Sequence, residues 1–392
     1  MKTPFSNTLD QLAPSGIRRF FDMILDSKDI VSLGIGEPDF STPKSIINRV
    51  KKTLDEGRTS YTSNTGMIEL REEIAKYMQK KLKCSYDPKD EVFITMGVSE
   101  GADLTLRAIL NPGDEVIFPE PGYVCYPPLI TLAGGKVVSV DTTKTNFIPT
   151  ADIIKEKTTP NTKAIVLCTP NNPTGTVIPT NTLKEIAQLA KKHDFWVITD
   201  EIYAEIIFDN YQYDTIASFE GMKERTLVLS GFSKAFAMTG WRLGYICGPK
   251  EFIERALKIH QYSALCAPIM SQYAAIEALQ NGLGDVERMR LAYEERRNLL
   301  IGGLRSIGIE VIKPEGAFYC FPSIKGTGLT SEEFSVKLLQ QEKCAVIPGN
   351  GFGQAGEGYV RCCFASSNAN IEEALIRIEK FYKSIKKGDT HA

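Results

Sequence analysis

Short runs of apolar, β-branched residues alternate with longer stretches of helical period between about residues 92 and 250. Such an alternation is typical of a mostly parallel sheet whose faces are covered by helices. Turn signals such as Asn-Pro-Gly-Asp at 111–114 separate the runs. The pattern predicts a seven-stranded, doubly wound α/β layer, with strands at 92–95, 115–118, 136–140, 163–167, 195–199, 226–229 and 243–247.

A different pattern begins near residue 268, where apolar positions at helical spacing continue to about residue 306, interrupted by Gly282 and Gly284. A helix of this length could connect two domains. Beyond it, the sequence predicts a smaller α+β domain with strands at 310–312, 317–321, 344–347 and 359–363, and helices at 331–339 and 371–383. We expect a large domain over residues 46–280 and a small domain formed by residues 1–45 and 281–392.

The composition is that of an ordinary globular protein, with 43% apolar and 24% charged residues among 392. Lysine and arginine total 46 against 48 acidic residues, so no overall charge favours binding to nucleic acid or to an anionic membrane. The first residues lack the basic start and apolar run of a secretory signal, and no transmembrane-length apolar stretch occurs. We therefore expect a cytoplasmic protein whose partner is a small molecule.

Nine cysteines are scattered along the chain without a Cys-x-x-Cys pair, which favours reduced thiols over disulfides or a metal site. Cys362 and Cys363 are adjacent, but no second pair of ligands lies nearby in the sequence, so we interpret them as strand residues. A metal site or a histidine-based triad is also disfavoured because the chain has only three histidines, which are His193, His260 and His391.

A lysine among small residues follows the strand predicted at 226–229. In the segment SGFSKAFAMTGWRLG, Lys234 stands eight positions before Arg242. Burial lowers the pKa of a lysine and makes its neutral amine available to react with a carbonyl group, and an arginine offers a planar fork to a phosphate. Taken alone, the two residues would more simply be a lysine after a strand and an arginine paired with a carboxylate.

Three further segments place polar residues or glycines at strand ends. Asp200 ends an apolar strand in VITDEIYAE, and the segment TPNNPTG at 169–175 follows another strand. Taken alone, Asp200 would more simply be the N-cap of a helix, and TPNNPTG would be an ordinary turn. In ITMGVSEG, at 94–101, a strand, a glycine turn and a helix start would present free backbone amides to an anion.

Taken in this order, the segments resemble the class-I aminotransferases of fold type I, which depend on pyridoxal phosphate. The resemblance extends from residue 34 to residue 365 and is to the bacterial branch with aspartate, aromatic or broad specificity. It implies that Lys234 holds the cofactor as a Schiff base and that Asp200 pairs with the protonated pyridine nitrogen. It also implies that Tyr203 and Asn172 donate hydrogen bonds to the ring hydroxyl oxygen.

The resemblance assigns the cofactor phosphate to the amides of Val98 and Ser99, the Ser99 hydroxyl and Arg242. Ser233, beside the lysine, is a further expected cofactor contact. Some relatives carry a serine three residues before the lysine as another phosphate donor, whereas Gly231 stands at that place in this chain.

Tyr123 matches the aromatic residue that stacks on the cofactor. Tyr61 matches a tyrosine that reaches the phosphate of the other subunit's cofactor, which implies a two-fold homodimer with shared sites. Arg361 matches the arginine that binds the substrate α-carboxylate bidentately. Gly36 and Asn172 are expected to contact the substrate as well.

The resemblance implies transfer of an amino group from an L-amino acid to a 2-oxo acid, with 2-oxoglutarate as the expected acceptor and ping-pong kinetics. Lys234 would move the proton that Cα releases. Ser99 stands where some dicarboxylate-specific relatives have a basic residue, which argues against a strict preference for aspartate. The amino donor stays open, and its distal end could be approached by Arg18, Arg19, Gln261 and Tyr262.

Two other enzyme functions stay open on the sequence. A carbon–sulfur lyase or a ring-forming synthase of the same fold would share nearly every residue named above, so the motifs exclude neither. Two further functions are less consistent with the sequence. A non-enzymatic regulator of this fold would normally carry an additional DNA-binding module. A nicotinamide-dependent dehydrogenase is disfavoured because no strand is followed by a Gly-x-Gly-x-x-Gly turn with an acidic residue downstream.

Overall fold

The computed structural model describes residues 6–10, 12 and 29–388. A seven-stranded sheet forms the centre of its larger part, with strand order β2-β8-β7-β6-β5-β3-β4. β8 is antiparallel to both of its neighbours, and the other strand pairs are parallel. The strands are β2 (Val92–Thr95), β3 (Glu115–Glu120), β4 (Lys136–Asp141), β5 (Thr162–Cys168), β6 (Trp196–Asp200), β7 (Thr226–Gly231) and β8 (Gly244–Cys247). The predicted α/β fold is therefore confirmed, and all seven strands were predicted within two residues of their observed ends.

Helices cover both faces of this sheet because alternate residues of its strands point in opposite directions. In β5, Ala164 and Val166 belong to the hydrophobic cluster on one face, which includes residues of α5 (Gly97–Ile109) and α9 (Lys250–Ser263). Ile165 and Leu167 belong to the cluster on the other face, with residues of α8 (Thr180–His193). The remaining helices of this part are α3 (Lys44–Asp55), α4 (Ile68–Leu82), α6 (Tyr126–Leu132) and α7 (Ala151–Lys157).

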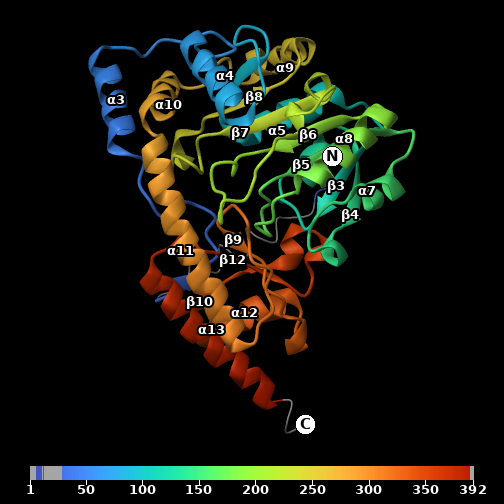
Figure 1. Ribbon diagram of the computed structural model, residues 1–392, viewed down its shortest axis with the longest axis vertical. Helices are drawn as coiled ribbons and strands as arrows, with labels where there is room; N and C mark the ends of the chain where they lie inside the picture. Colours follow the sequence, from blue (N-terminus) through green and yellow to red (C-terminus); the bar gives the residue numbers. More distant parts are fainter. Residues whose placement is uncertain (1–5, 11, 13–28, 389–392) are drawn as a thin grey trace, which may run out of the picture.

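Two successive helices replace the long helix that the sequence predicts after residue 268. α10 (Ile269–Asn281) ends at Gly282, and α11 (Leu283–Ile307) then continues over 25 residues. A Cβ at Gly282 would lie 2.7 Å from the carbonyl oxygen of Ala278, so a side chain there would crowd the last turn of α10. Figure 1 shows α11 running from the larger part of the molecule to the part that contains α12 (Ser331–Glu342) and α13 (Asn368–Gly388).

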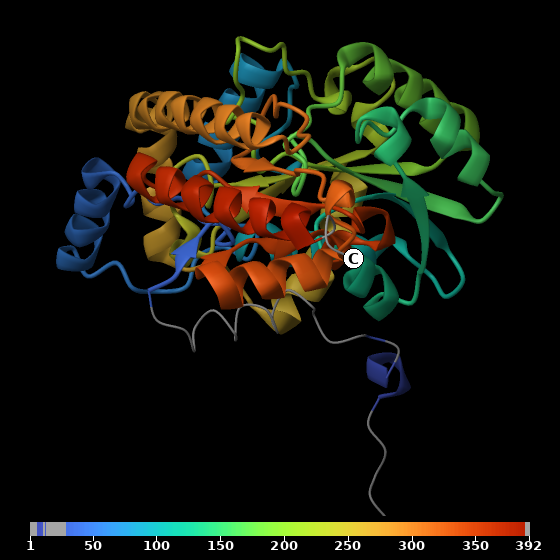
Figure 2. The same ribbon diagram turned by 90° about the horizontal axis from the view of Figure 1, so that it is seen from below.

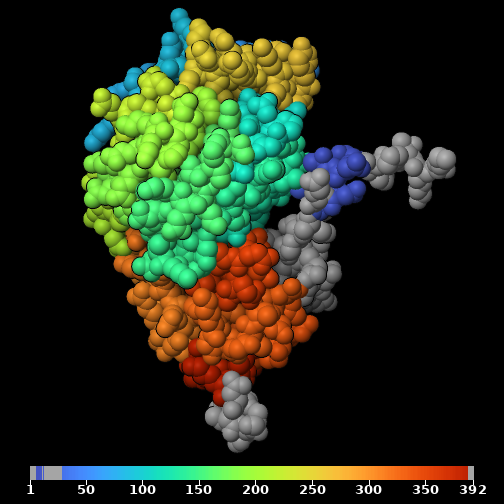
Figure 3. Space-filling view, turned by 90° about the vertical axis from the view of Figure 1, so that its right-hand side faces the viewer, coloured from blue at the N-terminus to red at the C-terminus, as the bar shows by residue number. Residues whose placement is uncertain are grey.

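The smaller part has little regular sheet. β11 (Ile347–Pro348), β12 (Val360–Cys363) and β9 (Tyr319–Cys320) form an antiparallel sheet in that order, and β1 (Val31–Ser32) pairs in parallel with β10 (Cys344–Ala345). In Figure 2, α13 lies between α11 and α12, and in Figure 3 this orange and red part packs below the rest of the chain. A short helix, α1 (Asn7–Asp10), lies near the N-terminus and contacts α6.

The strand predicted at 310–312 is wrong. These residues form an irregular segment after α11, because Glu310 receives only one backbone hydrogen bond from a neighbouring chain segment, from Ser323, and no ladder follows. The interpretation of Cys362 and Cys363 as strand residues is confirmed, since both lie in β12. Because β1 pairs with β10, Val31 and Ser32 join the smaller part, whereas α1 contacts α6 of the larger part. We propose the domain division at 46–280 against 1–45 with 281–392.

Within the described ranges, none of the helices has the length and apolarity needed to cross a bilayer.

Candidate active site

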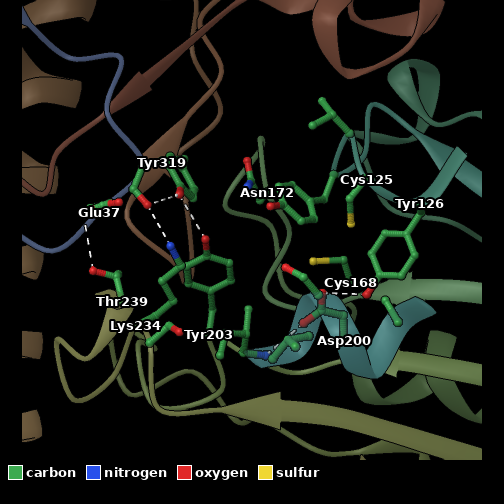
Figure 4. A pocket seen from close by; sticks show the side chains of 18 of the residues that line it. Glu37, Cys125, Tyr126, Cys168, Asn172, Asp200, Tyr203, Lys234, Thr239 and Tyr319 are labelled. Atoms are coloured by element: carbon green, nitrogen blue, oxygen red, sulfur yellow. Dashed lines mark hydrogen bonds between the residues drawn. The ribbon is translucent and has the colours of Figure 1, made fainter. Parts of the chain in front are cut away.

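A cavity of about 470 Å³ lies at the carboxyl ends of β5, β6 and β7, where loops of a parallel sheet ordinarily bind ligands. The smaller part of the molecule closes it through residues 35–37, Tyr319 and Arg361. Every residue that the sequence assigns to the site lines this cavity except Tyr61. Figure 4 shows Lys234, Tyr203 and Tyr319 together on one side, and Asp200, Tyr126, Cys125 and Cys168 together on the other.

Lys234 follows β7 and extends into the cavity. Its Nζ donates a hydrogen bond of 2.8 Å to the carbonyl oxygen of Gly36. Burial lowers the pKa of the amine to about 8; the cations Arg361 and Arg242 act in the same direction, while the acidic groups of Cys363 and Glu37 oppose it. A neutral amine is therefore accessible to Lys234 at mildly alkaline pH.

Asp200, the last residue of β6, is a carboxyl group that is only 3% exposed. Burial raises its pKa to about 6, and the shift is limited by hydrogen bonds to Oδ2 from the Tyr126 hydroxyl, at 2.7 Å, and to Oδ1 from the Ile202 amide, at 3.2 Å. A cationic group beside Asp200 would lower this pKa and stabilise the carboxylate. The position suits a protonated ring nitrogen.

Arg361 lies in the middle of β12 and is buried between two aromatic rings, with its guanidinium carbon 4.5 Å from the centre of Tyr319 and 4.9 Å from that of Phe352. Its two terminal nitrogens donate to Asn172 Oδ1 at 3.1 Å and to the Gly34 carbonyl oxygen at 2.8 Å. The buried Nε has no partner among the described residues. An unpaired buried guanidinium nitrogen is costly, so this end of the cavity suits an anion.

Tyr319 joins the two halves of the site. Its hydroxyl is 3.0 Å from the hydroxyl of Tyr203 and donates a hydrogen bond of 3.3 Å to the carbonyl oxygen of Gly36, which also accepts from Lys234. A Cβ at Gly36 would lie 2.6 Å from this hydroxyl, so the close approach requires glycine.

An anion-binding cup forms where β2 turns into α5. Gly97 adopts a φ of +77°, and a Cβ there would lie 2.8 Å from Nη2 of Arg242. A Cβ at Gly244 would lie 2.7 Å from the amide nitrogen of Val98. The first amides of a helix have no intrahelical acceptor, so Val98 and Ser99 can donate to an anion beside Arg242. The cup thus depends on two glycines that leave room for it.

The absence of a serine at position 231 has a structural reason. A Cβ at Gly231 would lie 2.8 Å from Cα of Gly244 and 2.9 Å from the carbonyl oxygen of Leu243, because β7 and β8 approach closely there. A side chain at this position would need the backbone to move.

The remaining predicted residues are distributed as follows. Tyr123 and Ser233 line the cavity, and burial raises the pKa of Tyr123 to about 12. Tyr61 is 81% exposed and lies outside the cavity of its own chain. Tyr262 is 88% exposed, and Arg18 and Arg19 lie outside the described residues.

The sequence did not indicate Tyr126 or Tyr319. Tyr126 stands three residues after Tyr123, and its role depends on Asp200, which is 74 positions away. Tyr319 contacts Tyr203 across 116 positions. The aromatic-rich segments GYVCYP and GAFYCFP were the available signals, but both are equally typical of buried strands and helices.

Among the described residues, no group of three or more His, Cys, Asp and Glu side chains is arranged to hold a metal ion. The donors instead fit pyridoxal phosphate. The cup and Arg242 suit its phosphate, Asp200 suits its ring nitrogen, and Arg361 retains a free donor for the carboxylate of an amino acid.

Comparison with known proteins also points to a pyridoxal-phosphate enzyme. The family model for aminotransferase class I and II matches residues 28–378. An aspartate aminotransferase of Pyrococcus abyssi is 45% identical, and aromatic-amino-acid aminotransferase 2 of Thermococcus litoralis is 44% identical; each match covers 97% of this chain and 99% of the relative. The crystal structure of an aromatic aminotransferase from Pyrococcus horikoshii superposes with a TM-score of 0.90 at 42% identity, covering 95% of this chain and 100% of that structure.

Proposed function

The chain belongs to the class I and II aminotransferases and is therefore a pyridoxal-phosphate-dependent enzyme that transfers amino groups, and we propose that the cavity around Lys234 is its active site. The observation that carries this proposal is the convergence of three groups in one cavity. These are an amine of lowered pKa, a buried carboxyl group and a buried arginine with a free donor.

We assign the cofactor contacts as follows. The amides of Val98 and Ser99, the Ser99 hydroxyl and Arg242 hold the phosphate. Asp200 faces the pyridine nitrogen, Tyr123 stacks on the ring, and Ser233 lies beside it. Tyr203 and Asn172 donate to the ring hydroxyl oxygen. When bound, the cofactor supplies an electron-withdrawing ring that stabilises negative charge at the substrate Cα.

Lys234 serves first as the covalent attachment point and then as the proton carrier. Its amine has a pKa near 8, so neither taking up a proton nor releasing one carries a large energetic penalty at neutral pH. Lys234 can therefore take the proton from the substrate Cα and deliver it to the C4′ carbon of the cofactor. The carbonyl oxygen of Gly36 holds Nζ at a defined place while it is free.

Arg361 binds the α-carboxylate of the substrate. Two of its nitrogens are already fixed by Asn172 and Gly34, and two aromatic rings hold its plane, so little conformational freedom is lost when the substrate binds. Fixing the carboxylate orients the Cα–H bond relative to the ring, which is the geometric requirement for removing that proton. Gly36 lies at the same end of the cavity.

For substrates, we propose an L-amino acid donor and 2-oxoglutarate as acceptor, used in ping-pong order. Relatives named as aspartate and as aromatic-amino-acid aminotransferases are about equally similar to this chain. Ser99 provides no positive charge for a second carboxylate, which favours a donor that is not restricted to aspartate. The lyase alternative is not favoured, because the similar proteins are aminotransferases.

An absorbance scan of the purified protein with single amino acids tests this function. We expect a visible band from cofactor attached to Lys234 that converts to the spectrum of pyridoxamine phosphate with particular donors. A persistent band with release of ammonia would indicate a lyase. No band after addition of pyridoxal phosphate would contradict the proposal.

We also propose that the enzyme is a homodimer in which Tyr61 reaches the phosphate cup of the partner chain. Tyr61, Tyr262, Leu265 and Met96 are exposed large side chains, and Met96 directly precedes the cup residue Gly97. Asn64, three residues after Tyr61, donates a hydrogen bond of 2.8 Å to the carbonyl oxygen of Leu265, just beyond the end of α9. Light scattering coupled to gel filtration should give twice the chain mass of 43.5 kDa. A monomer that binds the cofactor fully would contradict this proposal.

We propose a cytoplasmic location and a role in amino-acid metabolism. All nine cysteines are free thiols in the structure, which suits a reducing compartment. Cell fractionation with activity assays would test the location.

A further inference from the structure

His260 is a buried histidine outside the cavity that the proposed mechanism does not use. It lies near the end of α9 with no exposed surface, and its ring packs edge-on against Phe93 with centroids 5.0 Å apart. Nδ1 is 2.8 Å from Oε1 of Glu100, whereas Nε2 has no partner among the described residues. A buried nitrogen without a hydrogen-bond partner is destabilising, so a phenylalanine would pack here at less cost. The contact with Glu100 therefore needs an explanation other than packing.

Glu100 connects this histidine to the turn that forms the phosphate cup. Its second oxygen, Oε2, accepts a hydrogen bond of 2.6 Å from the amide of Met96. Met96 precedes Gly97, the residue of positive φ that lies against Arg242, and the Thr95 hydroxyl fixes the Gly97 carbonyl oxygen at 3.0 Å. The chain from His260 through Glu100 thus ends on the backbone of the cup.

The position of Glu100 would otherwise oppose phosphate binding. A carboxylate in the first turn of a helix can accept hydrogen bonds from the free amides there, and it repels a second anion. Met96 and His260 each engage one oxygen of Glu100, so both carboxylate oxygens have partners other than the amides of Val98 and Ser99.

We propose that Glu100 and His260 are positioning residues that set the phosphate cup of the cofactor site. His260 fixes the rotamer of Glu100, Glu100 fixes the turn at Met96, and the turn directs the amides of Val98 and Ser99 toward the phosphate. The inference rests on the proposed function of this cavity as the pyridoxal phosphate site.

The test compares two ligands that differ only in the phosphate. Full-length protein, freed of cofactor, is titrated with pyridoxal phosphate and with pyridoxal, and the dissociation constants are obtained from absorbance. We expect Glu100→Ala and His260→Phe to weaken binding of pyridoxal phosphate about 10-fold, the effect of one charge-assisted hydrogen bond, and to change pyridoxal binding less than about 2-fold. Glu100→Gln should restore nearly normal binding, since an amide can accept from Met96 and donate to His260.

Asp103→Asn is the matched control. Asp103 lies on the same helix and pairs with Arg107 at 3.2 Å on its exposed side, so this change removes the same charge without touching the turn. Its ratio of the two dissociation constants should equal that of the wild type.

Equal weakening of both ligands, or unchanged binding with only a lower melting temperature, would overturn the inference. If Glu100→Ala does not fold by circular dichroism, His260→Phe decides, because it keeps an aromatic ring against Phe93. A wild-type protein that binds neither ligand would instead refute the proposed function.

Discussion

The hydroxyl of Tyr126 donates a 2.7 Å hydrogen bond to Oδ2 of Asp200, and both side chains are buried. Tyr126 is the first residue of α6 and Asp200 is the last residue of β6. The hydrogen bond therefore connects α6 to β6 in the wall of the cavity. A charge-assisted hydrogen bond of this kind stabilises the carboxylate against the desolvation that raises its pKa.

Tyr126→Phe should therefore raise the pKa of Asp200 and move the acid limb of the kcat/KM profile to higher pH by about one unit. The activity is expected to fall because a protonated Asp200 no longer holds the ring nitrogen cationic. Tyr293→Phe is the control, because the buried Tyr293 hydroxyl has no partner among the described residues. An unchanged acid limb would show that this hydrogen bond does not set the protonation of Asp200.

Lys234→Ala should lower turnover by at least ~10³-fold, because it removes both the attachment point and the proton carrier. The visible absorbance band of the bound cofactor should disappear as well. Lys250→Ala, which removes an exposed lysine paired with Asp90, should retain both properties. Near-normal turnover by the Lys234 variant would exclude the assigned role.

Arg361→Lys should reduce kcat/KM for the amino donor about 100-fold, mainly through a higher KM, since a lysine cannot make the paired contact with a carboxylate. The absorbance of the bound cofactor should not change, because Arg361 faces the substrate end of the cavity. Arg305→Lys, at the last turn of α11, serves as the control. Equal losses of cofactor and of substrate binding would indicate that the substitution disrupts the site generally.

Gly231→Ser should destabilise the protein by about 1–3 kcal/mol, although it adds a potential phosphate donor. The new Cβ would meet Cα of Gly244 at 2.8 Å, and the backbone there cannot move without disturbing the cup. Chemical denaturation with and without cofactor measures the change. A variant that is as stable as the wild type and binds the cofactor more tightly would contradict this account.

Glu201 should make stability fall as pH rises through the neutral range. Burial raises its pKa from the ordinary value of 4.5 to about 7, and hydrogen bonds from Thr215 and Thr199 only partly oppose this. The folded state therefore binds more protons than the unfolded state, so stabilisation is complete below pH 4.5 and is lost as pH rises through about 7. Glu201→Gln should flatten this part of the pH profile of the free energy of unfolding, by an amount on the order of 3 kcal/mol. Parallel profiles for the two proteins would refute the prediction.

The large sheet could be predicted closely because its strands are buried on both faces and appear as continuous apolar runs. The smaller part was harder, since β9, β10 and β11 have only two residues each and are defined by partners far away in the chain. The strand predicted at 310–312 is wrong for a related reason. Val311 and Ile312 are partly buried, as the apolar pattern indicates, but no neighbouring segment among the described residues forms a β-ladder with them.

The sequence identified residues that now line one cavity, since each stood in a segment with its own recognisable pattern. It could not identify Tyr126, Tyr319 or the pair of Glu100 and His260. Their importance lies in distances between side chains that are remote along the chain, and no local pattern encodes such distances. The roles of the cavity residues stay predictions until the variants above are measured.

The carbonyl oxygen of Gly36 has a consequence for mutagenesis and for evolution. It accepts from both Lys234 and Tyr319, yet no codon change can delete it, because it belongs to the main chain. A saturation screen at position 36 would report only the crowding of new side chains against the Tyr319 hydroxyl, 2.6 Å from the added carbon. The acceptor itself would be invisible to such a screen, and replacing this amide by an ester in a semisynthetic protein would be needed to weaken it.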